Sequence, residues 1–448
     1  MHVVNSVIPK KPSVFEGVTP YHWLVVLIAS FGWLFDCMDQ RIFALSRESA
    51  LTEVLGSGAA DAVVKSWVGW ATAVMMIGWA TGGIIFGTMS DKFGRVRTMV
   101  VTLLLYSIFT GLSGLARTPE EFMIYRFIMG LGIGGMFASA TTLVAESVPG
   151  NFRSIALGSL QALSSVGNLI GSLVSTQIKP GQADFLFGMS GWRILFFVGV
   201  LPALLVVPIV FWLREPEAWK EAKAKSKNAD GTTKRIGSIA DLFKVPYRKN
   251  LLVGVGLGLA GMAGLWGIGF FSPELISTAL KGESQGVIDT VRGYGTALQD
   301  VGSFLGMVTF TLVATYMGRK KAFFGGFVLC LVTTIYVFNN LKTGNDAYWM
   351  LPLMGFAQLS VFGGYAIYFP ELFPTRLRGT GVGFCYNTVR YLAAAFPPML
   401  MGLNQVLMRQ GVADPFRKSA TVLSFIFVLG LVALIWAPET KGKPLPED

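Results

Sequence analysis

Charged residues are scarce in this sequence, and long apolar runs take their place. Asp, Glu, Lys and Arg make up only 14% of the 448 residues, whereas hydrophobic residues make up 52% and the mean hydropathy is +0.56. This composition excludes an ordinary soluble protein, whose surface needs far more charge. The 53 glycines suit a membrane protein, because small residues let helices approach closely in lipid. We therefore predict an all-α integral membrane protein that crosses the bilayer many times.

Cysteine and histidine are also scarce, which limits the chemistry of the chain. Cys37, Cys330 and Cys385 all lie in apolar runs, so neither a disulfide framework nor a metal site is indicated. His2 and His22 lie near the N-terminus, and no nucleophile motif stands at membrane depth. We therefore expect no enzyme activity and no cofactor. The net charge of +11 does not indicate nucleic acid, because in a membrane chain the face that carries the charges is what matters.

Twelve apolar runs are long enough to cross a bilayer as helices of about 20 residues. They lie near residues 21–45, 66–89, 98–116, 120–146, 154–177, 192–213, 250–276, 293–316, 321–339, 346–370, 379–401 and 418–437. An even number of spans places both termini on one face of the membrane.

The distribution of positive charge predicts which face that is. The terminal segments and the loops on their side hold 23 of the 37 lysines and arginines, whereas the opposite loops hold 11. Because positively charged loops remain in the cytoplasm, both termini are predicted to be cytoplasmic. The basic segment 214–249 is predicted to be a cytoplasmic linker between two helical units, 1–213 and 250–448.

The two units carry similar motifs at nearly the same spacing. The matched pairs are Glu146-x-x-Pro149-x-x-x-Arg153 with Glu371-x-x-Pro374-x-x-x-Arg378, Gly94-Arg95 with Gly318-Arg319, and Pro216-Glu217 with Pro438-Glu439. Their offsets are 225, 224 and 222 residues. Chance composition rarely produces three such pairs, so a duplicated six-helix unit is predicted.

The loop between the second and third runs, residues 87–97, is too short to recross the membrane, so the two runs are antiparallel neighbours. Its sequence is Gly87-Thr88-Met89-Ser90-Asp91-Lys92-Phe93-Gly94-Arg95-Val96-Arg97. The pattern G-x-x-x-D-K-x-G-R-x-R resembles the signature loop between helices 2 and 3 of the major facilitator superfamily of secondary transporters. A simpler alternative is a positive anchor that only sets topology.

Other motifs extend the resemblance over the whole chain. They are Trp192-Arg193, Arg214-Glu215-Pro216-Glu217, the segment 368–376 and Pro438-Glu439-Thr440-Lys441-Gly442, which resemble the metabolite:proton symporter and sugar porter branches. Asp36-Cys37-Met38-Asp39 is similar to the D-G-[FY]-D motif of aromatic acid:proton symporters, whereas the sugar porters' amide cluster is missing from 261–271. The resemblance implies a monomeric major facilitator fold, with twelve transmembrane helices in two pseudo-symmetric six-helix bundles, in a bacterial inner membrane.

Two acids in the first span are the candidates for proton coupling. Asp36 and Asp39 lie three residues apart, so they share one face of a helix. An ionisable side chain at membrane depth costs about 2.5–3.5 kcal/mol, and two neighbouring carboxylates there favour holding a proton. The alternative is that one acid is a structural partner of Arg41 or Arg126.

Arg390 is the main candidate for binding a substrate, because it lies near the middle of the eleventh span with no carboxylate nearby in sequence. A guanidinium can bind a carboxylate through two hydrogen bonds, so an anionic substrate is indicated. The alternative is an ion pair with Asp300 in the eighth span. The remaining candidate substrate contacts are polar or aromatic residues within spans, namely Arg126, Gln161, Asn168, Trp266, Tyr386 and Asn387.

Charged residues at the cytoplasmic ends of the helices are the candidates for gating. They are Asp91, Arg95, Arg97, Glu146, Arg153, Glu371 and Arg378. Salt bridges among them are expected to hold the inner side closed while the outer side is open, and to part as the two units rock.

Together these residues predict proton-coupled uptake of a small organic anion, an aromatic acid or another carboxylate, by alternating access. The alternative within transporters is a proton-coupled sugar or polyol symporter, and a more distant one is a membrane sensor that does not transport. The expected partners are the substrate, protons and membrane lipid, without nucleic acid.

Overall fold

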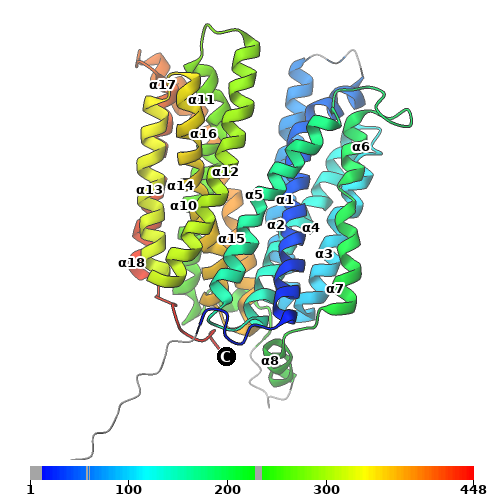
Figure 1. Ribbon diagram of the computed structural model, residues 1–448, viewed down its shortest axis with the longest axis vertical. Helices are drawn as coiled ribbons and strands as arrows, with labels where there is room; N and C mark the ends of the chain where they lie inside the picture. Colours follow the sequence, from blue (N-terminus) through cyan, green and yellow to red (C-terminus); the bar gives the residue numbers. More distant parts are fainter. Residues whose placement is uncertain (1–12, 57–58, 60, 228–234, 448) are drawn as a thin grey trace, which may run out of the picture.

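The computed structural model describes residues 13–56, 59, 61–227 and 235–447, and within these ranges the chain is helical with no β-strand beyond one isolated bridge. Two bundles of helices stand side by side (Figure 1). The starts of α1 and α10 and the end of α18 lie at one end of the molecule, together with α8. We call that end the terminal face.

The N-terminal bundle contains the first six spans. Its helices are α1 (Pro20–Leu55), α2 (Asp61–Phe93), α3 (Arg95–Ser113), α4 (Pro119–Ser147), α5 (Arg153–Gln177), α6 (Gly191–Val198), the 3₁₀ helix η1 (Leu201–Leu205) and α7 (Val206–Trp212). The last three form the sixth span, which η1 interrupts at Pro202 because proline cannot donate the helical hydrogen bond.

The C-terminal bundle contains the other six spans. Its helices are α10 (Tyr247–Gly267), η2 (Gly269–Phe271), α11 (Ser272–Ala279), α12 (Gln285–Met317), α13 (Arg319–Asn340), α14 (Gly344–Leu372), η3 (Thr375–Leu377), α15 (Arg378–Ala393), α16 (Phe396–Arg409), α17 (Pro415–Leu423) and α18 (Ile426–Trp436). Two short helices, α8 (Glu217–Lys227) and α9 (Ile239–Leu242), lie between the bundles in sequence.

All twelve predicted spans are helical in the described residues, and eleven of them form helices long and apolar enough to cross a membrane. The exception is the eleventh span, expected at 379–401, which is interrupted between the end of α15 at Ala393 and the start of α16 at Phe396, just before Pro397 and Pro398, and continues to Arg409. Several helices run beyond the predicted limits, and α1 ends at Leu55 instead of residue 45. Hydropathy detects only the part of a helix that faces lipid, so it misses polar extensions into water.

The two bundles touch mainly through α2 with α15 and α5 with α12. The contact is between backbones, because glycines face each other. A side chain at Gly87 would place its Cβ 2.6 Å from the carbonyl of Gly379, and one at Gly383 would place it 2.2 Å from the carbonyl of Gly83. Gly83 and Gly87 lie in the part of α2 nearest its end at Phe93, and Gly379 and Gly383 lie in the first two turns of α15, so the molecule is closed toward the terminal face.

The repeat predicted from the motifs is visible in matching contacts. Gly94 and Gly318 both adopt positive φ, 119° and 106°, where one helix ends and the next begins. The next backbone N–H donates to Glu215 in the first bundle and to Glu439 in the second. The match of Glu439 with Glu217 was therefore wrong by two residues, since Glu217 is an exposed residue of α8 that pairs with Lys220.

Candidate functional site

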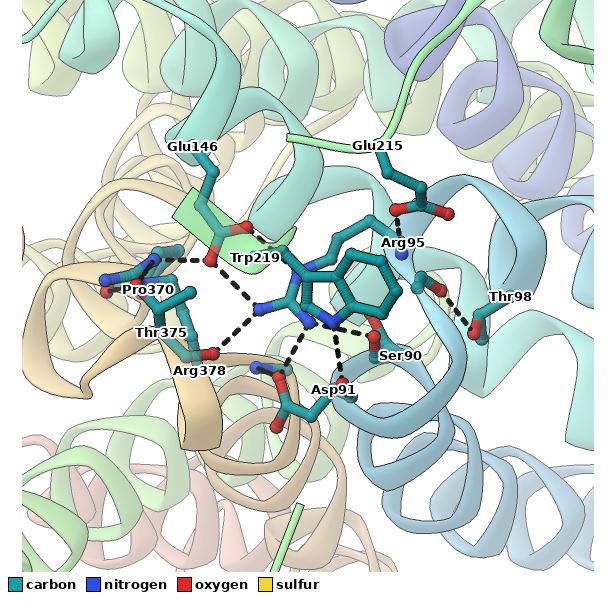
Figure 2. A network of polar contacts seen from close by, with 12 residues as sticks. Ser90, Asp91, Arg95, Thr98, Glu146, Glu215, Trp219, Pro370, Thr375 and Arg378 are labelled. Atoms are coloured by element: carbon teal, nitrogen blue, oxygen red, sulfur yellow. Dashed lines mark hydrogen bonds and ion pairs between the residues drawn. The ribbon is translucent and has the colours of Figure 1, made fainter. Parts of the chain in front are cut away.

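Arg95 is the centre of a polar network at the terminal face, drawn in Figure 2. Its side chain is completely buried and donates to both carboxylate oxygens of Glu146, at 2.9 and 3.0 Å. It also donates to the carbonyl of Ser90 at 2.8 Å and lies 3.1 Å from Asp91. A further bond of 2.8 Å reaches the carbonyl of Thr375 in the C-terminal bundle. Arg95 therefore joins the two bundles.

Asp91, near the end of α2, caps the first turn of α15 in the opposite bundle. Its carboxylate accepts hydrogen bonds from the backbone N–H groups of Gly379 and Thr380, at 2.9 and 2.8 Å, and from Thr380 Oγ1 at 2.6 Å. The start of a helix offers unpaired N–H groups and the positive end of the helix dipole, which stabilise a carboxylate. The acid of the signature loop thus binds across the interface.

Glu146, near the end of α4, is shared by arginines from both bundles. Besides Arg95, it accepts a hydrogen bond from Nη1 of Arg378, the first residue of α15. Figure 2 shows the carboxylate of Glu146 between these two guanidiniums. Arg378 is fully buried and also donates through Nε to the carbonyl of Pro370 at 3.0 Å. A single carboxylate therefore neutralises part of the charge of two buried cations.

The second repeat contributes a related cluster. Arg319 donates to both oxygens of Glu371, at 2.7 and 3.0 Å, and to Ser154 Oγ of α5 in the other bundle. Arg153 donates to the carbonyl of Ala145 at 2.9 Å, which matches the bond of Arg378 to Pro370. We call Asp91, Arg95, Glu146, Arg319, Glu371 and Arg378 the gate network.

Arg97 stands apart from the gate network, although its place in the signature loop predicted a gating role. Its side chain is exposed, and only its backbone N–H takes part, by donating to Glu215 at 3.1 Å. In the described residues the Arg97 side chain makes no ion pair or hydrogen bond. Its position two residues after Arg95 explains this, because residues two apart lie on different sides of a helix.

The segment between the bundles docks beneath the gate network. Trp219 of α8 donates through Nε1 to the carbonyl of Asp91 at 2.7 Å, so it contacts the N-terminal bundle. The backbone N–H of Gly237 donates to the carbonyl of Arg376 at 2.9 Å, on the C-terminal side. The linker therefore holds on to both bundles in this closed arrangement.

Asp241 strengthens the attachment on the C-terminal side. Its carboxylate lies 2.8 Å from Lys244 Nζ and 3.0 Å from Arg376 Nη1. The hydrogen bond from Lys244, with the further bond from Arg376, holds the pKa of Asp241 below its ordinary value. The carboxylate is therefore charged at neutral pH.

Asp39 and Arg126 form a buried pair inside the N-terminal bundle. Asp39 Oδ2 lies 3.7 Å from Arg126 Nη1, and both side chains are completely buried. Arg126 also donates from Nε to Ser113 Oγ at 3.0 Å, and its guanidinium lies 4.3 Å from the centre of the Phe196 ring. Of the partners that the sequence left open for the two acids, Arg126 is therefore the one that Asp39 has.

Asp36 lies one helical turn from Asp39 and, unlike it, forms no ion pair with a described residue. It is completely buried, and neither of its carboxylate oxygens has a hydrogen-bond partner among the described residues. It interacts electrostatically with Asp39 and with Arg390 of the opposite bundle. This carboxylate is therefore buried with its hydrogen-bonding capacity unused, within electrostatic reach of a cation from the opposite bundle.

Arg390 is buried at the interface of the bundles, 3% exposed. Its guanidinium carbon lies 3.5 Å from the centre of the Trp79 ring and 5.0 Å from that of Tyr386. Its Nε donates to Asn387 Oδ1 at 3.3 Å, while Nη1 has no partner in the described part of the chain. The alternative ion pair with Asp300 is absent, because Asp300 binds Arg41 at 2.6 Å.

Aromatic rings from both bundles surround this arginine. Phe137 of α4 stacks on Tyr386 of α15 with ring centres 3.8 Å apart and an interplanar angle of 19°. Trp33 of α1 lies 4.9 Å from Phe137 and 6.4 Å from Tyr386. Rings and a cation that lie far apart in the sequence thus form one cluster, which suits a planar anion chemically.

The other predicted substrate contacts are spread over two helices. Gln161 of α5 is buried with its Oε1 unpartnered in the described structure, and Asn168, two turns further along, is half-buried. Trp266 is half-buried next to the break that ends α10 at Gly267. The structure thus brings Tyr386 and Asn387 to Arg390 but places Gln161 and Asn168 on a separate helix.

A family model described as Major Facilitator Superfamily matches residues 28–398. The chain belongs to the Major Facilitator Superfamily. Members of this superfamily are transporters and not enzymes, so the fold and the transport class predicted from the signature loop are confirmed.

Curated relatives within the superfamily cover most of the chain. The cis,cis-muconate transport protein of Acinetobacter baylyi is 31% identical over 324 residues, which cover 72% of this chain and 74% of that protein. The niacin transporter NiaP of the same species is 25% identical over 450 residues, which cover 95% and 96%. Among solved structures, the proton:xylose symporter XylE of E. coli superposes with a TM-score of 0.75 at 21% identity, over 95% of this chain and 98% of that one.

Several residues of these clusters were not predicted as functional from the sequence. They are Trp79, Glu215, Trp219, Asp241, Arg319, Thr380 and the pair Arg41 and Asp300. The repeat contains the information for Arg319, which matches Arg95 at an offset of 224. Glu215 lies in the motif 214–217, from which no role was predicted. The remaining residues belong to no motif, because their roles depend on which helices meet.

Proposed function

We propose that this superfamily member takes up a small organic anion, an aromatic acid or another carboxylate, together with one or more protons. The observation that carries the proposal is Arg390. A buried guanidinium with an unused donor, between aromatic rings and without an ion-pair partner in the described residues, is costly unless an anion binds to it. Muconate and niacin, which name two of the relatives, both carry carboxylates and support this substrate class.

Asp36 and Asp39 are the proposed proton carriers. A proton on Asp36 would offset the charge of the arriving anion and would give the unpartnered carboxyl oxygens a neutral form at membrane depth. Proton binding by Asp39 would break its ion pair with Arg126. Protonation and anion binding would then favour each other, because Asp36 and Arg390 interact electrostatically.

Alternating access follows if the units 1–213 and 250–448 rock around this site, with 214–249 as their linker. We propose that the terminal face is cytoplasmic, as the charge distribution predicts, and that the gate network keeps it closed in the state described here. Opening then requires Asp91 to leave the start of α15 and Arg378 to leave Glu146. The proposed gating residues are those predicted from the sequence, with Arg319 added and with Arg97 contributing only its backbone N–H.

The experiment is counterflow uptake in proteoliposomes, with labelled benzoate-like acids, short-chain carboxylates, nicotinate and hexoses, with and without an inward proton gradient. For Arg390→Gln, loss of a charged hydrogen bond worth about 1.5–3 kcal/mol should raise the KM for the acid about 10- to 100-fold. Arg409→Gln is the matched control, since Arg409 is exposed at the end of α16. Hexose uptake that survives Arg390→Gln would establish the sugar or polyol alternative, and absence of uptake for every compound would favour a sensor.

A further inference from the structure

An apolar groove lies between α10 and α18 on the C-terminal bundle, and its lining includes neither Arg390 nor a residue of the gate network. The two helices pack against each other, and the groove between them has a volume of about 420 Å³. Its walls include Leu252, Gly256, Val432 and Trp436. Gly256 helps to keep it open, because a Cβ there would already lie 3.0 Å from the Cβ of Ala433.

The walls of the groove face the surroundings of the protein and not its core. Leu252 is 68% exposed and Trp436 is 55% exposed, and both belong to membrane-spanning segments. Side chains in that position contact lipid, so a molecule that fills the groove arrives from the bilayer and not from water. Trp436 is the last residue of α18, whose end lies at the terminal face, and tryptophan is commonly enriched where a membrane helix meets water.

The end of the groove at the terminal face carries two positive charges. Arg248 and Lys249 lie in the first turn of α10 and line the groove. Both are exposed, and neither side chain makes a hydrogen bond or ion pair with a described residue. The acid nearest in sequence, Asp241, is already bound to Lys244 and Arg376.

These two cations do not stabilise their own helix. The start of a helix is the positive end of its dipole, where acidic side chains are favourable and basic ones are not. A membrane-surface anchor would explain the charges alone, but it would not explain why they line the mouth of an apolar groove. Basic pockets between transmembrane helices on the cytoplasmic side bind the head groups of anionic lipids.

We propose that the groove between α10 and α18 is a binding site for an anionic phospholipid of the leaflet on the terminal face. The phosphate lies between Arg248 and Lys249, and one acyl chain lies along Leu252, Gly256 and Val432. The site is independent of the transported substrate. It places a lipid against the outer side of α10, whose other side packs on α15 through Gly254 and Gly258.

Native mass spectrometry of the purified full chain in detergent tests the site by titration with dioleoylphosphatidylglycerol or dioleoylphosphatidylcholine. The wild type should bind the first phosphatidylglycerol more tightly than phosphatidylcholine. Arg248→Gln combined with Lys249→Gln should weaken the first phosphatidylglycerol about 30-fold, at about a fivefold effect per basic residue, and leave phosphatidylcholine unchanged. The control is Lys225→Gln with Lys321→Gln, which removes two exposed charges elsewhere on the terminal face.

A second variant tests the apolar part of the site. Val432→Trp fills the groove from a position that is 40% exposed, so it should weaken binding of both lipids without disturbing the core. The proposal is overturned if the double variant binds phosphatidylglycerol as tightly as the control does, or if the wild type does not distinguish the two lipids. Binding that is unchanged in Val432→Trp would overturn it as well.

Discussion

Replacing Asp91 by Asn tests the gate network directly. The carboxylate makes three hydrogen bonds to Gly379 and Thr380 and an ion pair with Arg95. Hydrogen bonds to charged groups contribute about 1.5–3 kcal/mol each, and Asn keeps one acceptor oxygen of the two. We therefore expect the substitution to destabilise the closed state by about 3 kcal/mol relative to the open state, which lowers the closed-to-open ratio by a factor of about 150. A closed-to-open ratio of about 100 would fall to near 1.

Spin labels on Lys92→Cys and Lys321→Cys, one in each bundle and both exposed, measure this shift as a change in their distance distribution. The native cysteines are buried and so are protected from labelling. Thr315→Val is the matched control, because Thr315 holds the equivalent place in the second repeat and donates only to Thr311 of its own helix. In transport, Asp91→Asn should lower the rate and leave substrate affinity nearly unchanged. Normal turnover with an unchanged distance distribution would refute the gating role.

Three other perturbations test separate parts of the molecule. Gly383→Ala should separate the bundles at the terminal face, since the new Cβ would meet the Gly83 carbonyl at 2.2 Å; the same labels report it, and Gly402→Ala, with nothing within 4 Å, should leave the distance unchanged. Asp36→Asn should abolish gradient-driven accumulation but keep counterflow within about threefold of wild type, and accumulation that persists would remove Asp36 from coupling. The attachment of Asp241 to its two cationic partners should be fully present above pH about 4, because its pKa is lowered in the folded state, and should be lost at lower pH. Hydrogen exchange of residues 235–242 measures that loss, and Asp241→Asn should show no such pH dependence.

The architecture was predictable because a bilayer permits few solutions. Every backbone polar group must be satisfied within its own segment, so apolar runs become helices, and the repeat fixes how many belong together. The gate network was predictable in part, since Asp91, Arg95, Glu146, Glu371 and Arg378 all lie in repeated or signature motifs. The hydrogen-bond partners of these residues were not predictable, because a motif identifies the residues but does not show which helix end lies opposite them.

The choice of ion-pair partners shows most clearly what could not be predicted from the sequence. Arg41 follows Asp39 by two residues and was considered as its partner, yet it binds Asp300, which is 259 residues away. Side chains two residues apart on a helix point in different directions, so proximity in sequence misled here. Trp219 and Thr380 belong to no motif at all, and their contacts with Asp91 arise only when the linker and α15 take their places.

The two repeats differ at the position where the first has Asp91 and the second has Thr315. As a result, the two lines of contact between the bundles differ in strength. Along α2 and α15, Asp91 clamps a helix start through three hydrogen bonds. Along α5 and α12, the equivalent Thr315 binds only its own helix, and the bond from Arg319 to Ser154 is what crosses. The contact that is held by more hydrogen bonds separates last. The bundles should therefore part first along α5 and α12, so that the initial opening is lateral and one-sided.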